Sequence, residues 1–380
     1  MLERMGRKLG RWLIMAGLSL GCTSVLAHTF VYVANYNNSM IASFVEHSDG
    51  TLLARGDVRT PSGPEAIVID KEGFVVTADS RAHAISVYRI QPTTGHLTQV
   101  AVWREDPRAN PFSLAASPHG QFLYVANSGD STVGIYRLDP TTGAITDAGI
   151  VHEPHGAKPY AIAPTPNGQF VYVANFGNDT IGMYRRLPGH GQLHKIGIFH
   201  ETAGNGPYSL SIGPDGRFLY VADYRTNILL VLAITKTGAL SLRDRIAEPF
   251  DHHPDSLVID PSGRYLFVAN TSANDISIFR IDRHSGRLTH VGHVATGSYP
   301  FSLTLDAAAR FVYAVNFGNS TISRYRLNRD SGVLTPIGTT AEASYADPYG
   351  IAAVTISAPT PSASPVPKKP KPLAASGKLP

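Results

Sequence analysis

The chain has 380 residues, a hydrophobic content of 43% and a formal net charge of +4, which allows one large β domain or two ordinary domains. The charge is uneven: residues 1–27 carry +3 and residues 357–380 carry +4, so residues 28–356 carry −3. A mildly acidic body argues against nucleic-acid binding. Cys22 is the only cysteine, so the residues after it can form no disulfide and no cysteine metal site.

The first 27 residues have the pattern of a signal peptide. Four basic residues precede the apolar run Trp12–Gly21, and Val25-Leu26-Ala27 places small residues where a signal peptidase reads them. We therefore expect export to the periplasm or the medium, with a mature chain that starts near His28. Two alternatives stay open, a lipoprotein signal ending at Cys22 and an uncleaved anchor, and only these would hold the protein at a membrane.

One strand-turn-strand unit recurs along the rest of the chain. Its alternating strand ends at an Asn or Asp, and these residues are 44 to 48 positions apart: Asn35, Asp79, Asn127, Asn175, Asp223, Asn270 and Asn316. Each full unit starts with a strand after a proline, as at Pro159, and a later turn contains a glycine in all seven units, as at Gly95. Four short strands in a unit of this length are typical of a β-propeller blade.

The two ends of the repeat region complete each other. The first unit lacks its inner strand and begins at Phe30, while residues 348–354 have the pattern of an inner strand with no unit of their own. The sequence therefore predicts an all-β fold, a seven-bladed β-propeller over residues 28–356 with four antiparallel strands per blade. The N-terminal strands and the C-terminal inner strand would share one blade and close the ring. Residues 357–380, rich in Pro and Lys, are expected to form a disordered tail.

The Tyr-Val-Ala-Asn strand at residues 172–175, followed by Thr180-Ile181, resembles the YVTN-repeat propellers. More widely, the chain resembles the lactonase family of seven-bladed β-propellers, which includes bacterial 6-phosphogluconolactonases. The resemblance implies a lactone hydrolase that uses a His, two Arg and a Glu on three consecutive blades. Here Tyr160 stands in place of the His, Tyr208 and Thr271 in place of the two Arg, and Tyr224 in place of the Glu. Lactonase activity therefore does not transfer residue by residue.

In a four-stranded meander, the Asn-ended hairpin loops and the blade-to-blade loops lie on one face and converge on the mouth of the central channel, the expected ligand site. The residues that follow the inner-strand prolines are two acids and five aromatics: Glu65, Asp255, Phe112, Tyr160, Tyr208, Phe301 and Tyr349. The aromatic side chains either pack between blades or line a ligand site, which Phe176, Tyr224 and Thr271 at the hairpin tips would extend. Glu65 and Asp255 are expected to be solvated carboxylates, on arcs of the ring too far apart for a tight acid–base pair.

Metal chemistry is weakly supported. His152 and His155 provide two imidazoles where a zinc site needs three or four ligands, and the cluster of His252-His253 with Asp251 and Asp255 is expected to have surface or capping roles. We expect no cofactor and no metal, and two functions remain. The first is a non-catalytic exported propeller whose mouth binds a small molecule, a glycan or a protein. The second is a lactone hydrolase with a base to activate water and a cation to stabilise the oxyanion. Its only plausible catalytic side chains are Arg225, His152 or His155, and Glu65 or Asp255.

Overall fold

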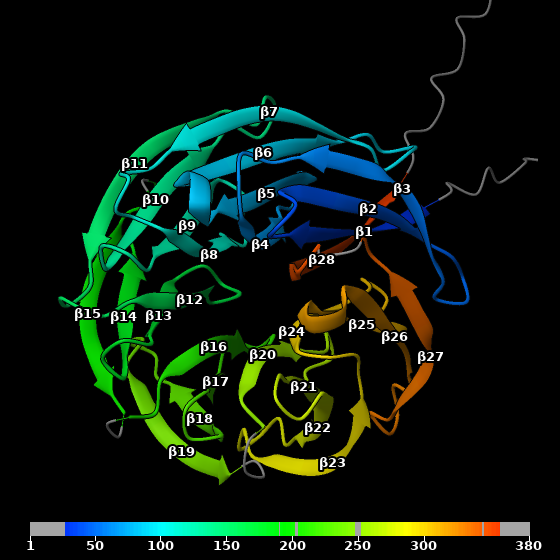
Figure 1. Ribbon diagram of the computed structural model, residues 1–380. Helices are drawn as coiled ribbons and strands as arrows, with labels where there is room; N and C mark the ends of the chain where they lie inside the picture. The colour runs from blue at the N-terminus through cyan, green and yellow to red at the C-terminus, as the bar shows by residue number, and fades with distance from the viewer. Residues whose placement is uncertain (1–26, 190, 202–203, 248–251, 344–345, 358–380) are drawn as a thin grey trace, which may run out of the picture. The chain divides into compact units, whose positions relative to one another are not determined.

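Seven four-stranded antiparallel sheets form the blades of a ring in the computed structural model (Figure 1), as the repeat predicts. The structure describes residues 27–189, 191–201, 204–247, 252–343 and 346–357. The predicted signal peptide and tail lie outside these residues, except that the first strand begins at Ala27 and the last ends at Ser357. No helix in these ranges is long and apolar enough to cross a membrane.

The strands are grouped by their place in the blade. The inner strands are β4 (Pro64–Ile69), β8 (Pro111–Ala116), β12 (Pro159–Pro164), β16 (Pro207–Ile212), β20 (Pro254–Ile259), β24 (Pro300–Leu305) and β28 (Pro348–Ser357). The second strands are β1 (Ala27–Asn35), β5 (Phe74–Asp79), β9 (Phe122–Asn127), β13 (Phe170–Asn175), β17 (Phe218–Asp223), β21 (Tyr265–Asn270) and β25 (Phe311–Asn316). The third strands are β2 (Met40–Glu46), β6 (Ala84–Ile90), β10 (Thr132–Leu138), β14 (Thr180–Arg186), β18 (Ile228–Ile234), β22 (Asp275–Ile281) and β26 (Thr321–Leu327). The outer strands are β3 (Leu52–Arg59), β7 (Leu97–Arg104), β11 (Ile145–His152), β15 (Leu193–His200), β19 (Leu240–Ala247), β23 (Leu288–Ala295) and β27 (Leu334–Ala341), and short 3-10 turns, η1 (Ser80–Ala82) and η2 (Phe317–Asn319), follow β5 and β25.

We number the blades in chain order, with blade 1 formed by β28, β1, β2 and β3. The second strand of each blade is buried on both faces because it lies between two neighbouring sheets; every residue of β13 is buried. The outer strands alternate between exposed and partly buried residues, as in β23. The core is thus a set of layers between adjacent blades, such as the one in which Phe30 and Tyr32 of blade 1 pack against Val75 and Tyr88 of blade 2.

The recurrent turn glycine is explained by contact between neighbouring blades. Gly95 has φ of +77°, and a Cβ atom there would lie 2.4 Å from Cδ1 of Phe30. The Tyr32 hydroxyl donates a hydrogen bond of 2.9 Å to the Gly95 carbonyl. Both the left-handed backbone and the close aromatic ring exclude a side chain, so this turn joins blade 2 to blade 1.

A recurrent glutamate after the outer strand binds the end of the second strand of the next blade. The buried carboxylate of Glu153 accepts hydrogen bonds from Asn175 Nδ2 at 3.1 Å and from the Tyr184 hydroxyl at 2.5 Å, so this glutamate joins neighbouring blades. Blade 5 has Asp223 where blade 4 has Asn175. Burial and the neighbouring Glu201 raise the pKa of Asp223 to about 10, and burial raises that of Glu201 to about 7. These two carboxyl groups therefore hold at least one proton at neutral pH.

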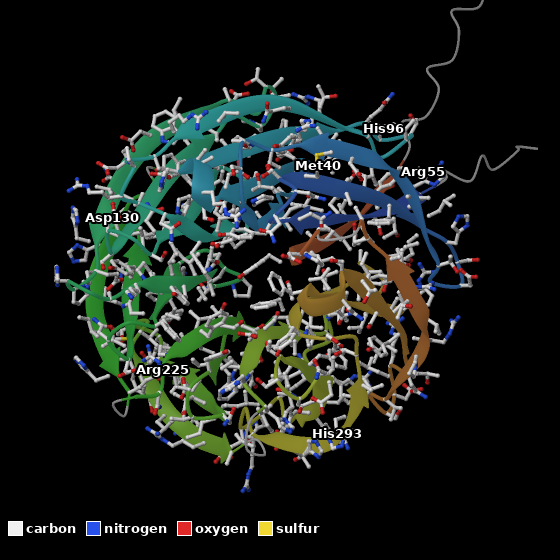
Figure 2. The ribbon with its side chains drawn as sticks, in the orientation of Figure 1. Met40, Arg55, His96, Asp130, Arg225 and His293 are labelled. Carbon is white, nitrogen blue, oxygen red and sulfur yellow. The ribbon has the colours of Figure 1, made fainter. Side chains whose placement is uncertain are left out.

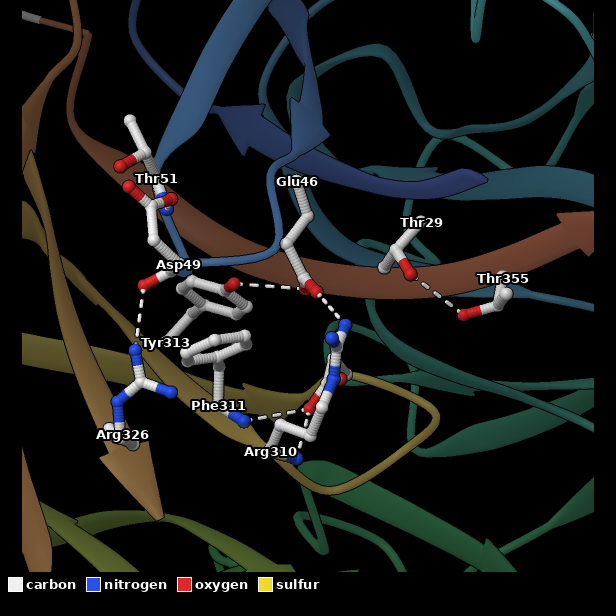
Figure 3. A network of polar contacts seen from close by, with 10 residues as sticks. Thr29, Glu46, Asp49, Thr51, Arg310, Phe311, Tyr313, Arg326 and Thr355 are labelled. Carbon is white, nitrogen blue, oxygen red and sulfur yellow. Dashed lines mark hydrogen bonds and ion pairs between the residues drawn. The ribbon is translucent and has the colours of Figure 1, made fainter. Parts of the chain in front are cut away.

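The ring closes in blade 1, where β28 from the C-terminal end pairs with β1 from Ala27↔Ser357 to Asn35↔Pro348. Figure 3 shows the hydroxyl groups of Thr29 and Thr355 in contact, 2.9 Å apart. It also shows the junction between blades 1 and 7, where Glu46 accepts hydrogen bonds from the Tyr313 hydroxyl at 2.9 Å and from Arg310 Nη2 at 2.6 Å. The predicted closure is confirmed.

Candidate functional site

The residue after each inner-strand proline is placed out of register by a β-bulge. In blade 4, Pro159 pairs with Asn175 and Ala161 pairs with Ala174, so Tyr160 has no partner on β13. The same shift occurs in the other six blades. A bulge redirects the side chain of the extra residue, and the repeat places seven such side chains around one axis.

The predicted convergence of two kinds of loop on one face is also confirmed. Phe176 N, in the hairpin loop after β13, donates to the carbonyl of Lys158, in the loop that leads into β12, at 3.1 Å. Gly177 N donates in the same way to the carbonyl of Ala157 at 2.7 Å. The bulge residues therefore lie at the channel mouth on the face that carries these loops.

A cavity of about 210 Å³ lies between the inner strands, and all seven blades line it. Its lining includes every bulge residue: Glu65, Phe112, Tyr160, Tyr208, Asp255, Phe301 and Tyr349. The next residue of each strand is small and also lines the cavity: Ala66, Ser113, Ala161, Ser209, Ser256, Ser302 and Gly350. The structure thus brings seven of the predicted site residues together in one cavity.

On one arc of the mouth the rings stack along the blades. The Phe112 and Tyr160 rings are stacked with centroids 4.1 Å apart, and Phe176 stacks on Tyr160 at 4.6 Å. Tyr208 meets Phe112 edge to face at 6.0 Å and Tyr160 at 5.4 Å. Because Phe112 and Tyr208 come from blades 3 and 5, which are not neighbours, these side chains reach across the channel rather than lying only between adjacent sheets.

On the other arc, Tyr349 of β28 is the central ring. It lies 4.8 Å from Phe301 and 5.0 Å from Tyr36, measured between ring centroids. Phe317 of η2 packs against Phe301 at 5.1 Å. Both alternatives for the aromatic residues therefore describe the structure: the rings pack against neighbours from other blades, and the same rings line the cavity.

The expectation that Glu65 and Asp255 are solvated carboxylates is wrong. Asp255 is only 4% exposed, and Glu65 is partly buried. Burial raises the pKa of Asp255 well above its usual range and raises that of Glu65 to about 8. The reason is the bulge, which turns both side chains into the cavity instead of toward solvent. Two blades with aromatic bulge residues lie between Glu65 and Asp255 on one arc of the ring, and three lie between them on the other. The two acids therefore line the same cavity without forming a tight acid–base pair, as the sequence spacing predicts.

Arg225, the cation expected in a hydrolase site, does not line the cavity. Figure 2 shows it over the green blades, away from the centre of the ring. Its Nη1 lies 3.4 Å from Asp179 Oδ1, and its guanidinium group covers the Phe176 ring at 4.0 Å. Arg225 thus has both an anionic and an aromatic partner, so an oxyanion in the cavity would have to compete with them.

The histidines lie elsewhere. His152 ends β11, and both His152 and His155 are exposed and absent from the cavity lining. His253 stacks on Tyr224 at 4.6 Å, and its Nδ1 lies 2.6 Å from Ser272 Oγ. In the described ranges no group of three or more His, Cys, Asp or Glu side chains is arranged to hold a metal ion.

The remaining predicted ligand residues surround the cavity without lining it. Tyr224 packs against Tyr208 at 5.4 Å, between that ring and His253. Thr271 is 4% exposed, and its hydroxyl donates to the Pro300 carbonyl at 3.3 Å. Tyr224 can therefore position Tyr208, whereas Thr271 ties its loop to the next inner strand.

The serines of the cavity were missed by the sequence analysis. Ser113, Ser209, Ser256 and Ser302 all lie two positions after an inner-strand proline. This shared position was a usable signal. Successive side chains of a regular strand point to opposite faces, however, so two consecutive residues can face one cavity only because of the bulge. Ser209 and Ser256 also accept hydrogen bonds from the neighbouring inner strands, from Leu257 N at 3.2 Å and Leu303 N at 3.3 Å.

Comparison with known proteins agrees with this architecture. A family model described as a lactonase, seven-bladed β-propeller, matches residues 26–249 and 246–347. A candidate 6-phosphogluconolactonase from Bacteroides fragilis superposes with a TM-score of 0.77 at 19% identity, covering 86% of this chain and 98% of that one. No curated protein sequence matches the chain.

Two further solved structures share the fold. The periplasmic gluconolactonase of Pseudomonas aeruginosa gives a TM-score of 0.76 at 20% identity, covering 87% of this chain and 99% of that one. Virginiamycin B lyase from Staphylococcus aureus gives 0.57 at 19% identity, with coverages of 77% and 88%. Since one architecture accompanies a hydrolase and a lyase, the fold alone does not assign a reaction.

Proposed function

Because this chain belongs to the lactonase family of seven-bladed β-propellers, we propose that it binds a small organic molecule in the cavity at its channel mouth. One observation carries the proposal. The cavity combines five aromatic rings with carboxyl oxygens that have no hydrogen-bond partner, Glu65 Oε2 and both oxygens of Asp255. Apolar walls with a few convergent polar groups are typical of a small-molecule site.

Binding without lactone hydrolysis is the better supported activity. Among the residues that the structure describes, no Arg, Lys or His lines the cavity, whereas the predicted hydrolase mechanism needs a cation beside the tetrahedral oxyanion. Arg225 is paired with Asp179 outside the lining. Loss of the four functional side-chain types of the family, at Tyr160, Tyr208, Tyr224 and Thr271, points the same way.

Lactone hydrolysis is the second candidate, and the pKa of Glu65, raised to about 8, favours it, since that range suits a general base. Ionised Glu65 would take a proton from the water that attacks the lactone carbonyl carbon. Protonated Glu65 would return this proton to the ring oxygen as its bond to the carbonyl carbon breaks. Tyrosine and serine hydroxyl groups of the lining would then be the hydrogen-bond donors to the oxyanion.

A ligand panel tests the proposal. Ligand-observed NMR with sugars, lactones, amines and short alcohols should detect binding to the wild-type protein, and Ser113→Phe, which fills the cavity, should abolish it. Binding that survives this substitution would place the site elsewhere. Lactone hydrolysis is measured on the same proteins with Glu65→Gln: turnover lost in this variant would establish the second candidate, and no turnover of any lactone would exclude it for the panel.

We also propose that the protein is exported, on the basis of the N-terminal pattern. The mature N-terminus from a fractionated culture should lie near His28. A lipid-modified Cys22 would instead indicate a membrane-attached lipoprotein, and an intact N-terminus in the membrane fraction would indicate an uncleaved anchor.

A further inference from the structure

Asp255 differs from every other buried aspartate that the structure describes. The others accept hydrogen bonds: Asp70, Asp79, Asp223, Asp260 and Asp306. Asp79, for example, accepts from the hydroxyl groups of Thr77 at 3.0 Å and Ser86 at 2.5 Å. Among the described residues, neither oxygen of Asp255 has a hydrogen-bond partner, so burial of this carboxyl group costs stability and adds no hydrogen bond to the fold.

The surroundings of the cavity favour a positive ligand. Among the described residues, Asp255 and Glu65 are the only acidic or basic side chains in its lining, apart from tyrosine hydroxyl groups. Arg81, the cation whose charge acts on Glu65, covers the Tyr36 ring at 4.0 Å and donates to Asn37 Oδ1 at 2.9 Å. Aromatic faces attract cations through their quadrupole, and aromatic side chains occupy both arcs between the two acids.

Resting on the proposed function, we propose that the ligand is a small organic cation of the alkylammonium class, held between Asp255, Glu65 and the aromatic residues of the mouth. A cavity of about 210 Å³ is smaller than the ~300–1,000 Å³ of drug-sized sites, which suits a ligand of this size. A bare metal ion fits less well, because Ca²⁺ takes about six to eight oxygen ligands and only two carboxyl groups converge here.

The cavity also predicts how binding depends on pH. Burial raises the pKa of Glu65 to about 8 and raises that of Asp255 well above its usual range, so the empty site favours the protonated form of both carboxyl groups. A cation favours their ionised form, so its binding releases protons and strengthens as the pH rises. The titratable groups that face Asp255 are Tyr208, Tyr224 and Tyr349. Those that face Glu65 are Tyr160, Tyr208 and Tyr349, together with the cation Arg81. Burial raises the pKa of each of these tyrosine hydroxyl groups, so they stay neutral near pH 7 and the two carboxyl groups account for the dependence.

Two probes of the same shape separate charge from size: choline and its neutral carbon isostere 3,3-dimethyl-1-butanol. Isothermal titration calorimetry of the wild-type protein should show choline binding at least about tenfold more tightly. The choline affinity should increase between about pH 6 and pH 8, by up to about tenfold per pH unit for each carboxyl group that must ionise, while the affinity for the alcohol stays constant.

Asp255→Asn should weaken choline binding at least about tenfold and reduce its pH dependence, without changing the affinity for the alcohol. The same variant should unfold at a higher temperature than wild type, because it removes a buried carboxyl group without partners. Glu65→Gln provides a second variant with the same expected loss. Asp215→Asn is the control: it removes an equal charge from an exposed turn between β16 and β17 and should leave choline binding unchanged.

Equal affinity for the two probes, choline binding independent of pH, or competition by Ca²⁺ at the same site would overturn the inference. The proposed function survives these outcomes if a sugar, lactone or alcohol from the panel binds and Ser113→Phe abolishes that binding. If Ser113→Phe alters the binding of no probe, including choline, both the inference and the proposed function are wrong.

Discussion

Substituting Gly95 by Ala should test how the blades are joined. Gly95 has φ of +77°, and its new Cβ would lie 2.4 Å from Phe30 Cδ1 and 2.5 Å from Phe30 Cε1. Phe30 is 1% exposed and packed between blades 1 and 2, so the ring cannot move aside without disturbing that layer. The same turn carries the hydrogen bond from Tyr32.

Gly73→Ala is a matched control in the same blade. Gly73 has φ of +82°, and a Cβ there meets nothing within 4 Å. Both variants carry the cost of a left-handed alanine, about 1–2 kcal/mol. Only Gly95→Ala adds overpacking of about 1–3 kcal/mol. We therefore expect a loss of about 1–2 kcal/mol for Gly73→Ala and about 2–5 kcal/mol for Gly95→Ala.

Urea unfolding followed by circular dichroism measures both losses, with the slope of each transition compared to wild type. The double variant Phe30→Ala/Gly95→Ala should lose less than the sum of the single variants, because the alanine at 30 removes the clash. Equal losses for Gly95→Ala and Gly73→Ala, or strict additivity in the double variant, would refute the contact as the reason for the repeated glycine.

Three further predictions follow from the fold and the site. Asp223→Asn would give blade 5 the Asn–Glu pairing that Asn175 makes with Glu153 in blade 4 and should stabilise the protein by about 1–3 kcal/mol. Because the folded-state pKa of Asp223 is raised to about 10, wild type loses stability as the pH rises from about 4 toward 10. The advantage of the variant in thermal unfolding should therefore grow with pH, and a constant advantage would contradict the raised pKa. Removing residues 346–380 deletes β28 and should leave an open, aggregation-prone ring, whereas removing residues 358–380 should leave the melting temperature unchanged. Size-exclusion chromatography and thermal unfolding distinguish the two products, and a monomeric, cooperatively folded product of the longer deletion would be inconsistent with ring closure by β28. Arg225→Ala should change stability by at most about 1 kcal/mol and ligand affinity by less than about twofold. A large loss of affinity in isothermal titration calorimetry would show that Arg225 contributes to ligand binding.

The fold could be predicted because each unit repeats its own turn signals and its buried strand. Pro and Gly at fixed positions set the turns, and seven copies average out the ambiguity of any single strand. Ring closure followed from what each end lacked, and the pairing of Ala27 with Ser357 confirms it.

The site could be predicted only in part. The position after the inner-strand proline was singled out from the sequence, where it holds two acids and five aromatic residues, and all seven of these residues line the cavity. The burial of Asp255 and Glu65 was missed, since it depends on a bulge that shifts the register by one residue. The pairing of Arg225 with Asp179 was also missed, because it joins two neighbouring blades across 46 positions of sequence.

The shared blade has a consequence for the order in which the protein can fold. Thr29 and Thr355, which touch in blade 1, are 326 positions apart, and β28 follows every other described strand in the sequence. Blades 2 to 7 can each assemble from consecutive strands as they emerge, but β1 has an unpaired edge until β28 arrives. The ring can therefore close only after the strands of blades 2 to 7 have been made. Glu65 and Asp255 are enclosed in their cavity only when Tyr349 takes its place beside them.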